Sequence, residues 1–215
     1  MKRSSLVLLF SIIFFSTVEA QSRPISYLGG STIVEESDRV STSVLTHYTF
    51  SPEFSLGLRA EYNRDEHFTI QSIHPTFLIK RWFGSDYQGN LYLYGGLGIA
   101  NGVKGSYLKN KSAIYGGIMA DWETRSLFLG YRSRHLEAGH FGKTFIQAIR
   151  FGFTPYLGNT GDLHTWLMVE IDHRAKSKSP ATITPMVRFF KDSLLVEIGY
   201  NLIETQPLIN FTYRL

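Results

Sequence analysis

The sequence of 215 residues contains no cysteine. This absence excludes a disulfide-stabilised scaffold, a lipoprotein and a zinc site built on thiolates. Charge is also sparse, because only 19% of the residues are ionisable acids or bases and the formal net charge is +4, an excess too small to indicate nucleic acid as a partner. Aromatic residues make up 14%, so the chain has enough apolar surface to fold and an intrinsically disordered protein is excluded.

Long apolar runs are missing after Gln21, so no transmembrane helix is expected there. The one extended run, Leu6 to Ser16, would rise roughly 16 Å as a helix, about half of the hydrocarbon thickness of a bilayer. It follows Lys2 and Arg3 and precedes the small residues of Val18-Glu19-Ala20. This pattern predicts a secretory signal peptide over residues 1–20 and a mature chain over residues 21–215.

The mature chain is dominated by alternation of apolar and polar residues with period two, which is typical of β-strands. Residues 54–62 are the clearest example: Phe, Leu, Leu, Ala and Tyr share one face and Ser, Gly, Arg and Glu the other. Clusters of turn-forming residues separate the segments, and the even spacing predicts one domain with a continuous antiparallel meander. The predicted strands are 25–35, 39–50, 53–63, 67–82, 90–101, 111–122, 125–135, 143–156, 163–173, 181–190, 193–202 and 206–215.

Alternation alone fits either a soluble β-barrel or sandwich with an apolar interior or a membrane barrel with its apolar face in lipid. Segment length favours the membrane barrel, because tilted strands of nine to eleven residues cross a bilayer and strands of soluble domains are shorter. We therefore predict an all-β fold, an antiparallel up-and-down transmembrane β-barrel of about twelve strands. A phase change between Ile70 and Ile73 predicts a β-bulge.

The polar faces carry ionised residues whose signs alternate from strand to strand, so opposite charges can pair across the sheet. Such a network suits a lumen in which each charge finds a partner or water. The alternative is the solvated outer surface of a soluble barrel. The residues predicted to line the lumen are Arg59, Glu61, Asp121, Arg132, Arg134, Arg150, Glu170, Asp172, Arg188, Glu197 and Arg214.

Aromatic residues lie at the ends of the apolar faces, as in the interfacial girdles of membrane barrels. These residues are Tyr48, Phe50, Tyr62, Trp122, Phe153, Tyr200 and Tyr213. A second aromatic group is predicted to face the lumen: Tyr92, Tyr94, Tyr115 and Trp166.

The last segment, Ile209 to Leu215, resembles the closing strand of bacterial outer-membrane β-barrel proteins. In that class the chain ends on an aromatic residue after alternating apolar positions, whereas this chain ends on Leu215. The resemblance implies location in the outer membrane and recognition of the last strand by the barrel assembly machinery. The stretches 124–140, 153–174 and 184–201 are similar to an uncharacterised group of proteobacterial barrel proteins, which implies no activity.

The function favoured by the sequence is a narrow outer-membrane channel or a lumen-binding protein for small polar or anionic solutes. A plugged structural barrel and a soluble periplasmic barrel remain alternatives. An enzyme acting on lipid acyl esters is a third, because Ser133 and His135 share the lipid-facing side of one strand and could act as nucleophile and base. We expect outer-membrane lipid as a partner, and no nucleic acid, cofactor or metal site, since no local spacing places three metal ligands on one face.

Overall fold

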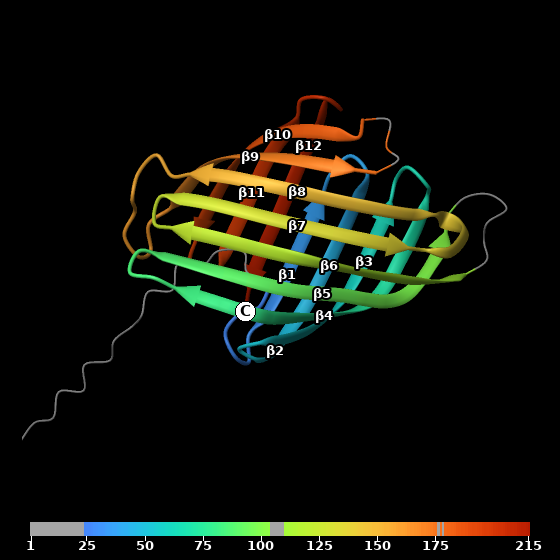
Figure 1. Cartoon of the computed structure of the whole chain (residues 1–215), viewed down its shortest axis with the longest axis horizontal. Helices are drawn as coiled ribbons and strands as arrows, with labels where there is room; N and C mark the ends of the chain where they lie inside the picture. The colour runs from blue at the N-terminus through green and yellow to red at the C-terminus, as the bar shows by residue number, and fades with distance from the viewer. Residues whose placement is uncertain (1–23, 104–109, 176, 178) are drawn as a thin grey trace, which may run out of the picture.

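The computed structural model describes residues 24–103, 110–175, 177 and 179–215, and these form a closed antiparallel barrel of twelve strands (Figure 1). Each strand pairs with its neighbours in sequence, and β1 pairs with β12 to close the barrel. The transmembrane up-and-down barrel predicted from the sequence is therefore confirmed. The strands are β1 (Ser31–Ser37), β2 (Ser41–Ser51), β3 (Phe54–Asn63), β4 (Phe68–Phe83), β5 (Tyr87–Gly102), β6 (Lys111–Thr124), β7 (Leu127–Glu137), β8 (Lys143–Phe153), β9 (His164–Arg174), β10 (Ala181–Lys191), β11 (Leu194–Asn201) and β12 (Gln206–Arg214).

The alternation of side chains sends the apolar face outward. On β3, Leu58 is 66% exposed, whereas Glu61 on the opposite face is 6% exposed. The same pattern repeats around the barrel, where isoleucine, leucine and phenylalanine form most of the outer surface. A water-soluble barrel would place these faces inside, so the exterior is suited to lipid. Among the described residues, no helix is long and apolar enough to cross a membrane.

Strand boundaries agree with the predicted segments to within a few residues, except at the first strand. The prediction of a strand over 25–35 is wrong in position, because β1 begins at Ser31. A bend precedes it, in which Gly29 adopts a positive φ of 80° and the N–H of Gly30 donates to the carbonyl of Tyr27. Gly29 and Gly30 still exchange backbone hydrogen bonds with Thr49 of β2, and the residues before them leave the barrel wall.

The bulge predicted between Ile70 and Ile73 is also wrong. The register of β4 against β3 is regular from Phe68 to Phe77, and the irregularity of β4 lies between Leu78 and Lys80, opposite β5. Ile70 is 2% exposed because it points inward with Phe68. These two side chains join a buried apolar cluster inside the barrel. The change of pattern in the sequence arises because apolar residues occupy inward positions at this end of β4.

Two apolar clusters fill parts of the interior. One lies where β4 to β7 approach the longer loops and consists of Phe68, Ile70, Ala100, Ala113, Tyr115, Leu136 and Ala138. The other joins β7, β9, β10 and β12 and consists of Phe128, Trp166, Met168, Met186 and Leu208. Together they narrow the lumen.

Candidate functional site: the charged lumen

A cavity of about 460 Å³ runs along the inside of the barrel. At one end, where β1 begins and β12 ends, it reaches Pro24, and at the other it reaches Asp65, Lys143 and Ser177 in and beside the connecting loops. Its middle is lined by charged side chains from opposite walls, including Arg132. A barrel of twelve strands is wider than the eight-strand type that side chains fill, which explains why space remains.

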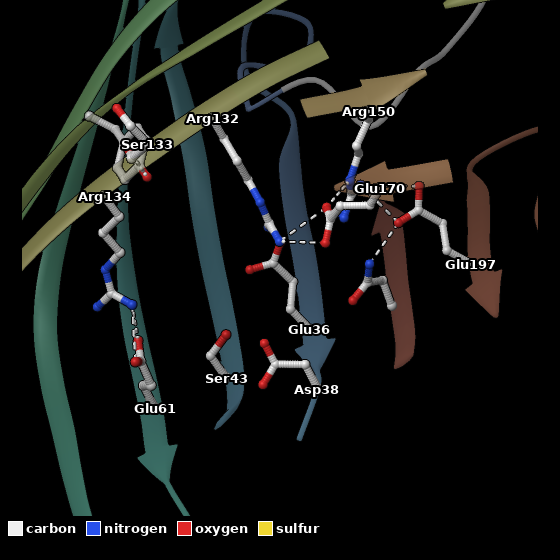
Figure 2. Close-up of polar contacts among 12 residues, drawn as sticks. Glu36, Asp38, Ser43, Glu61, Arg132, Ser133, Arg134, Arg150, Glu170 and Glu197 are labelled. Atoms are coloured by element: carbon white, nitrogen blue, oxygen red, sulfur yellow. Dashed lines mark hydrogen bonds and ion pairs between the residues drawn. The ribbon is translucent and has the colours of Figure 1, made fainter. Parts of the chain in front are cut away.

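An ion pair between Arg132 and Glu36 crosses this cavity. Arg132 lies on β7 and Glu36 on β1, and these strands are diametrically opposite in the twelve-strand order. The Nη1 atom of Arg132 is 3.2 Å from Oε1 of Glu36, and its Nη2 is 3.3 Å from Oε2 of Glu170 on β9 (Figure 2). This cross-lumen bridge divides the interior into two sides and forms a constriction.

The side formed by β8 to β12 is a dense ionic network. Nη1 of Arg150 is 3.1 Å from Oε2 of Glu197, and Arg150 also pairs with Glu170. Nη2 of Arg188 lies 2.6 Å from Oε1 of Glu197, and the amide of Asn210 donates to Oε2 of Glu197 at 2.7 Å. Glu170 and Glu197 are each 2% exposed. Charges buried to this degree are stable only when they are paired, so this side is structural.

The opposite side, formed by β2 to β7, holds a smaller network that borders the cavity. Oε2 of Glu61 forms ion pairs with two arginines: Nη1 of Arg134 lies 2.8 Å away and Nε of Arg59 lies 3.1 Å away. Arg59 also donates to Oγ of Ser43 at 2.7 Å. The guanidinium of Arg134 lies 4.3 Å from the ring centre of Tyr115, a cation–π contact.

The predicted lumen residues therefore divide into three groups. Arg59, Glu61, Arg132 and Arg134 line the cavity, whereas Arg150, Glu170, Arg188 and Glu197 form the network beside it. The other three lie apart from both, each against a neighbouring strand. Asp121 accepts a hydrogen bond from Asn90 at 2.6 Å, Asp172 accepts one from Thr182, and Arg214 is opposite Thr32 in the closing ladder.

The four aromatic residues predicted for the lumen are all largely inside the barrel, but only Tyr94 borders the cavity. The Tyr94 hydroxyl donates to the backbone carbonyl of Ser133 at 2.8 Å. Tyr92 is fully buried, and Trp166 packs in the second apolar cluster. The Tyr115 hydroxyl lies 2.8 Å from Nδ1 of His74, so it is occupied in a polar contact with the wall.

Several cavity residues are absent from the sequence-based prediction. Glu36, which makes the cross-lumen bridge, falls just beyond the segment predicted as the first strand. Asp38 and Arg174 pair at 3.2 Å near the loop end. His47 borders the cavity, and neither ring nitrogen has a hydrogen-bond partner among the described residues. Ser43, His47 and Thr49 are separated by even numbers of residues on β2 and therefore share its inner face. The alternation of this strand would have identified the histidine as an inward residue.

The segment after the predicted signal peptide narrows the cavity at the end where the termini lie. Ile25 is 3% exposed. The hydroxyl of Ser55 donates to the carbonyl of Pro24 at 3.2 Å, and the N–H of Ser26 donates to Oγ1 of Thr49 at the same distance. Ser55 and Thr49 are completely buried on the inner face of their strands. Residues 24–26 thus form a partial plug.

The proposed catalytic pair is not assembled. Arg132 and Arg134 point into the lumen. Because successive side chains of a strand point to opposite faces, Ser133 and His135 belong to the outer face of β7. No hydrogen bond joins Ser133 to His135 in the described part of the chain, and the neighbours of Ser133 across the sheet are Ile118 and Gln147. A serine nucleophile needs a base within hydrogen-bonding reach. Within the same described residues, no group of three or more metal-ligating side chains is present.

Comparison with known proteins finds no matching protein-family model and no matching curated protein. Among solved structures, the KdgM porin in complex with disordered oligogalacturonate is 13% identical, over 86% of this chain and 97% of that chain, with a TM-score of 0.49. OccAB1 of Acinetobacter baumannii is 7% identical over 81% of this chain and 57% of its own, with a TM-score of 0.46. The β domain of the Bordetella autotransporter Brka is 9% identical, over 86% and 96%, with a TM-score of 0.45. Resemblance at this level concerns the barrel alone, and the fold assignment rests on the strand pairing of this chain.

Proposed function

We propose that this protein is a narrow channel of the bacterial outer membrane that passes or binds small polar solutes. The observation that carries the proposal is the cavity along the lumen, which is lined by charged groups and stays unfilled although two apolar clusters and an ionic network occupy the rest of the interior. A purely structural barrel has no need of an unfilled cavity lined by charged side chains. The apolar exterior supports the membrane location.

The charge balance of the cavity favours small polar or dipolar solutes over simple anions. Each cavity arginine is paired with a carboxylate: Arg59 and Arg134 with Glu61, Arg132 with Glu36, and Arg174 with Asp38. Paired charges present both donors and acceptors to a passing solute and leave little net field to select ions by sign. The arginines therefore contribute hydrogen-bonding surface more than anion attraction.

Orientation follows from the loops. At the end where β1 begins and β12 ends, four of the five connections have two or three residues, at 52–53, 84–86, 125–126 and 192–193, and the fifth, 154–163, has ten; at the other end every connection has three or more residues, and 103–110, 138–142 and 175–180 have five to eight. In outer-membrane barrels the short turns are periplasmic and the longer loops extracellular. We assign both termini to the periplasm, in keeping with export by a signal peptide over residues 1–20, which lie outside the described part of the chain. Recognition of β12 by the barrel assembly machinery belongs to the same proposal.

The experiment is conductance of the refolded protein across a planar lipid bilayer. We expect small discrete current steps that scale with salt concentration, together with a reversal potential near zero in a salt gradient because the cavity charges are balanced. Absence of current steps from protein that is folded and inserted would contradict the channel and leave the structural barrel. A strong preference for anions would contradict the balanced-charge account of the solute.

A further inference from the structure

The outer face of the barrel carries an apolar groove of about 500 Å³ at the end where the termini lie. Its walls are the rings of Trp82 and Trp122, which are opposite each other across Gly89 in the ladders of β4, β5 and β6. Tyr87 extends one wall, with its ring centre 6.2 Å from that of Trp122. The groove exists because the residue between Trp82 and Trp122 across the three strands is Gly89, which has no side chain.

Packing does not require glycine at position 89. A Cβ atom built there would lie 3.6 Å from the carbonyl oxygen of Asp121 and from Trp82, and 3.8 Å from Trp122, which are ordinary contacts. By contrast, a Cβ at Gly117 would lie 1.9 Å from the carbonyl oxygen of Ser133, so glycine is needed there. Local packing therefore does not explain why residue 89 is a glycine. A ligand that occupies the space beside Gly89 would explain it.

A cation lies beside the groove on a surface that is mostly apolar. Lys80 is exposed on the outer face, and its Nζ lies 5.9 Å from the centre of the Trp82 ring. The irregularity of β4 between Leu78 and Lys80 places it there, opposite Leu91 of the groove. No carboxylate pairs with Lys80 among the residues that the structure describes. A lysine on the lipid face is costly unless it reaches an anionic headgroup.

We infer that this groove is a binding site for one phospholipid, whose acyl chain lies in the slot between Trp82 and Trp122 and whose phosphate is bound by Lys80. An acyl chain matches the apolar lining, and the phosphate matches the cation beside the Trp82 ring. Phospholipid is chosen over the lipid A of the outer leaflet because the groove lies at the terminal end, a choice that rests on the orientation in the proposed function. The binding site itself is independent of channel activity.

The test is quenching of tryptophan fluorescence by a phosphatidylglycerol with brominated acyl chains, added to the folded protein in detergent micelles. Two of the three tryptophans, Trp82 and Trp122, flank the groove, whereas Trp166 is inside the barrel. Saturable quenching at low mole fractions of lipid is expected for the native chain. Quenching that rises only linearly with lipid would overturn the site.

Gly89→Leu fills the slot and is expected to abolish the saturable component. Gly116→Leu is the matched control, because Gly116 is another outward-facing glycine with room for a side chain, its nearest contact being 3.7 Å away. If Gly89→Leu does not fold, Ala120→Leu fills the same groove from β6. Equal quenching in the filled variant and the control would contradict the proposal.

Lys80→Gln is expected to weaken binding of brominated phosphatidylglycerol about fivefold, since one lysine near an anionic lipid surface has an effect of that order. It should leave the affinity for brominated diacylglycerol, which has no phosphate, unchanged. Unchanged phosphatidylglycerol binding would overturn the role of the lysine. Lipid A that displaces the phospholipid with equal affinity would overturn the choice of phospholipid and the orientation, but not the channel.

Discussion

The ionic side chains of the lumen have two different roles, and burial separates them. Glu197 holds Arg150 and Arg188 and is 2% exposed, whereas Arg132 reaches across an open cavity and its side chain is 32% exposed. Removal of one charge from a fully buried ionic network leaves its partners without an opposite charge, which strongly destabilises the folded state. Removal of the bridging residue changes the width of the path more than the stability of the wall.

Glu197→Gln is therefore expected to destabilise the folded barrel by about 3 kcal/mol, because Arg188 loses its charged partner and Arg150 keeps only Glu170. The measurement is the free energy of unfolding in denaturant, followed by tryptophan fluorescence in lipid vesicles. Glu53→Gln, in an exposed turn, is the control. Equal stability of the two variants would show that the network is not structural.

Arg132→Ala is expected to raise the single-channel conductance, because the bridge between β7 and β1 is the group that crosses the cavity. Loss of this side chain widens the constriction and leaves Glu36 with only the 3.5 Å contact to Arg59, so selectivity should also shift toward cations. Glu53→Gln again serves as the control. Conductance and reversal potential identical to those of the native chain would place the constriction elsewhere.

For individual residues, alternation alone was enough to predict which charged side chains lie on the inner face, since side chains two residues apart share a face. It did not predict which of them meet. Arg132 and Glu36 are 96 residues apart, and their contact depends on barrel closure, which brings opposite walls together. Glu36 was missed because the first strand was placed too early, which moved it out of the predicted segment.

Among the elements, the segment of residues 24–30 differs most from the prediction. It was expected as a strand, but Gly29 turns the chain, and Pro24 and Ile25 lie against the inner faces of β2 and β3. Hydrogen bonds to Thr49 and Ser55 fix it there. A period-two pattern in so short a stretch cannot separate a wall strand from a segment that packs across the mouth of the barrel, because both contain apolar side chains that become buried.

Ile25→Ala is expected to increase the conductance by removing the buried apolar side chain of this plug. Leu28→Ala is the matched control, because Leu28 belongs to the same segment and is 64% exposed. Both variants are compared with the native chain in planar bilayers. If the two substitutions leave conductance equally unchanged, residues 24–26 do not limit the path.

Across the whole molecule, the sequence predicted the barrel well because twelve similar strands, joined in sequence by eleven connections, repeat one local rule of an alternating face followed by a turn. The inner filling could not be predicted in the same way. The apolar clusters around Ile70 and Trp166 are contributed by strands distant in sequence, and they interrupt the polar inner face at places that only closure defines. The phase change at Ile70 was visible, but its cause was tertiary packing and not a bulge.

The central claim is that the apolar face meets lipid and the charged face encloses an aqueous path. Ile118 and Met119 test it directly, because they are adjacent on β6 at the same depth, Ile118 exposed on the outside and Met119 lining the cavity. The chain has no native cysteine, so Ile118→Cys and Met119→Cys each carry a single nitroxide label. We predict that oxygen dissolved in the bilayer relaxes the label at 118 and that a water-soluble nickel chelate relaxes the label at 119. The reverse pattern, or a label at 119 that the chelate cannot reach, would contradict the account.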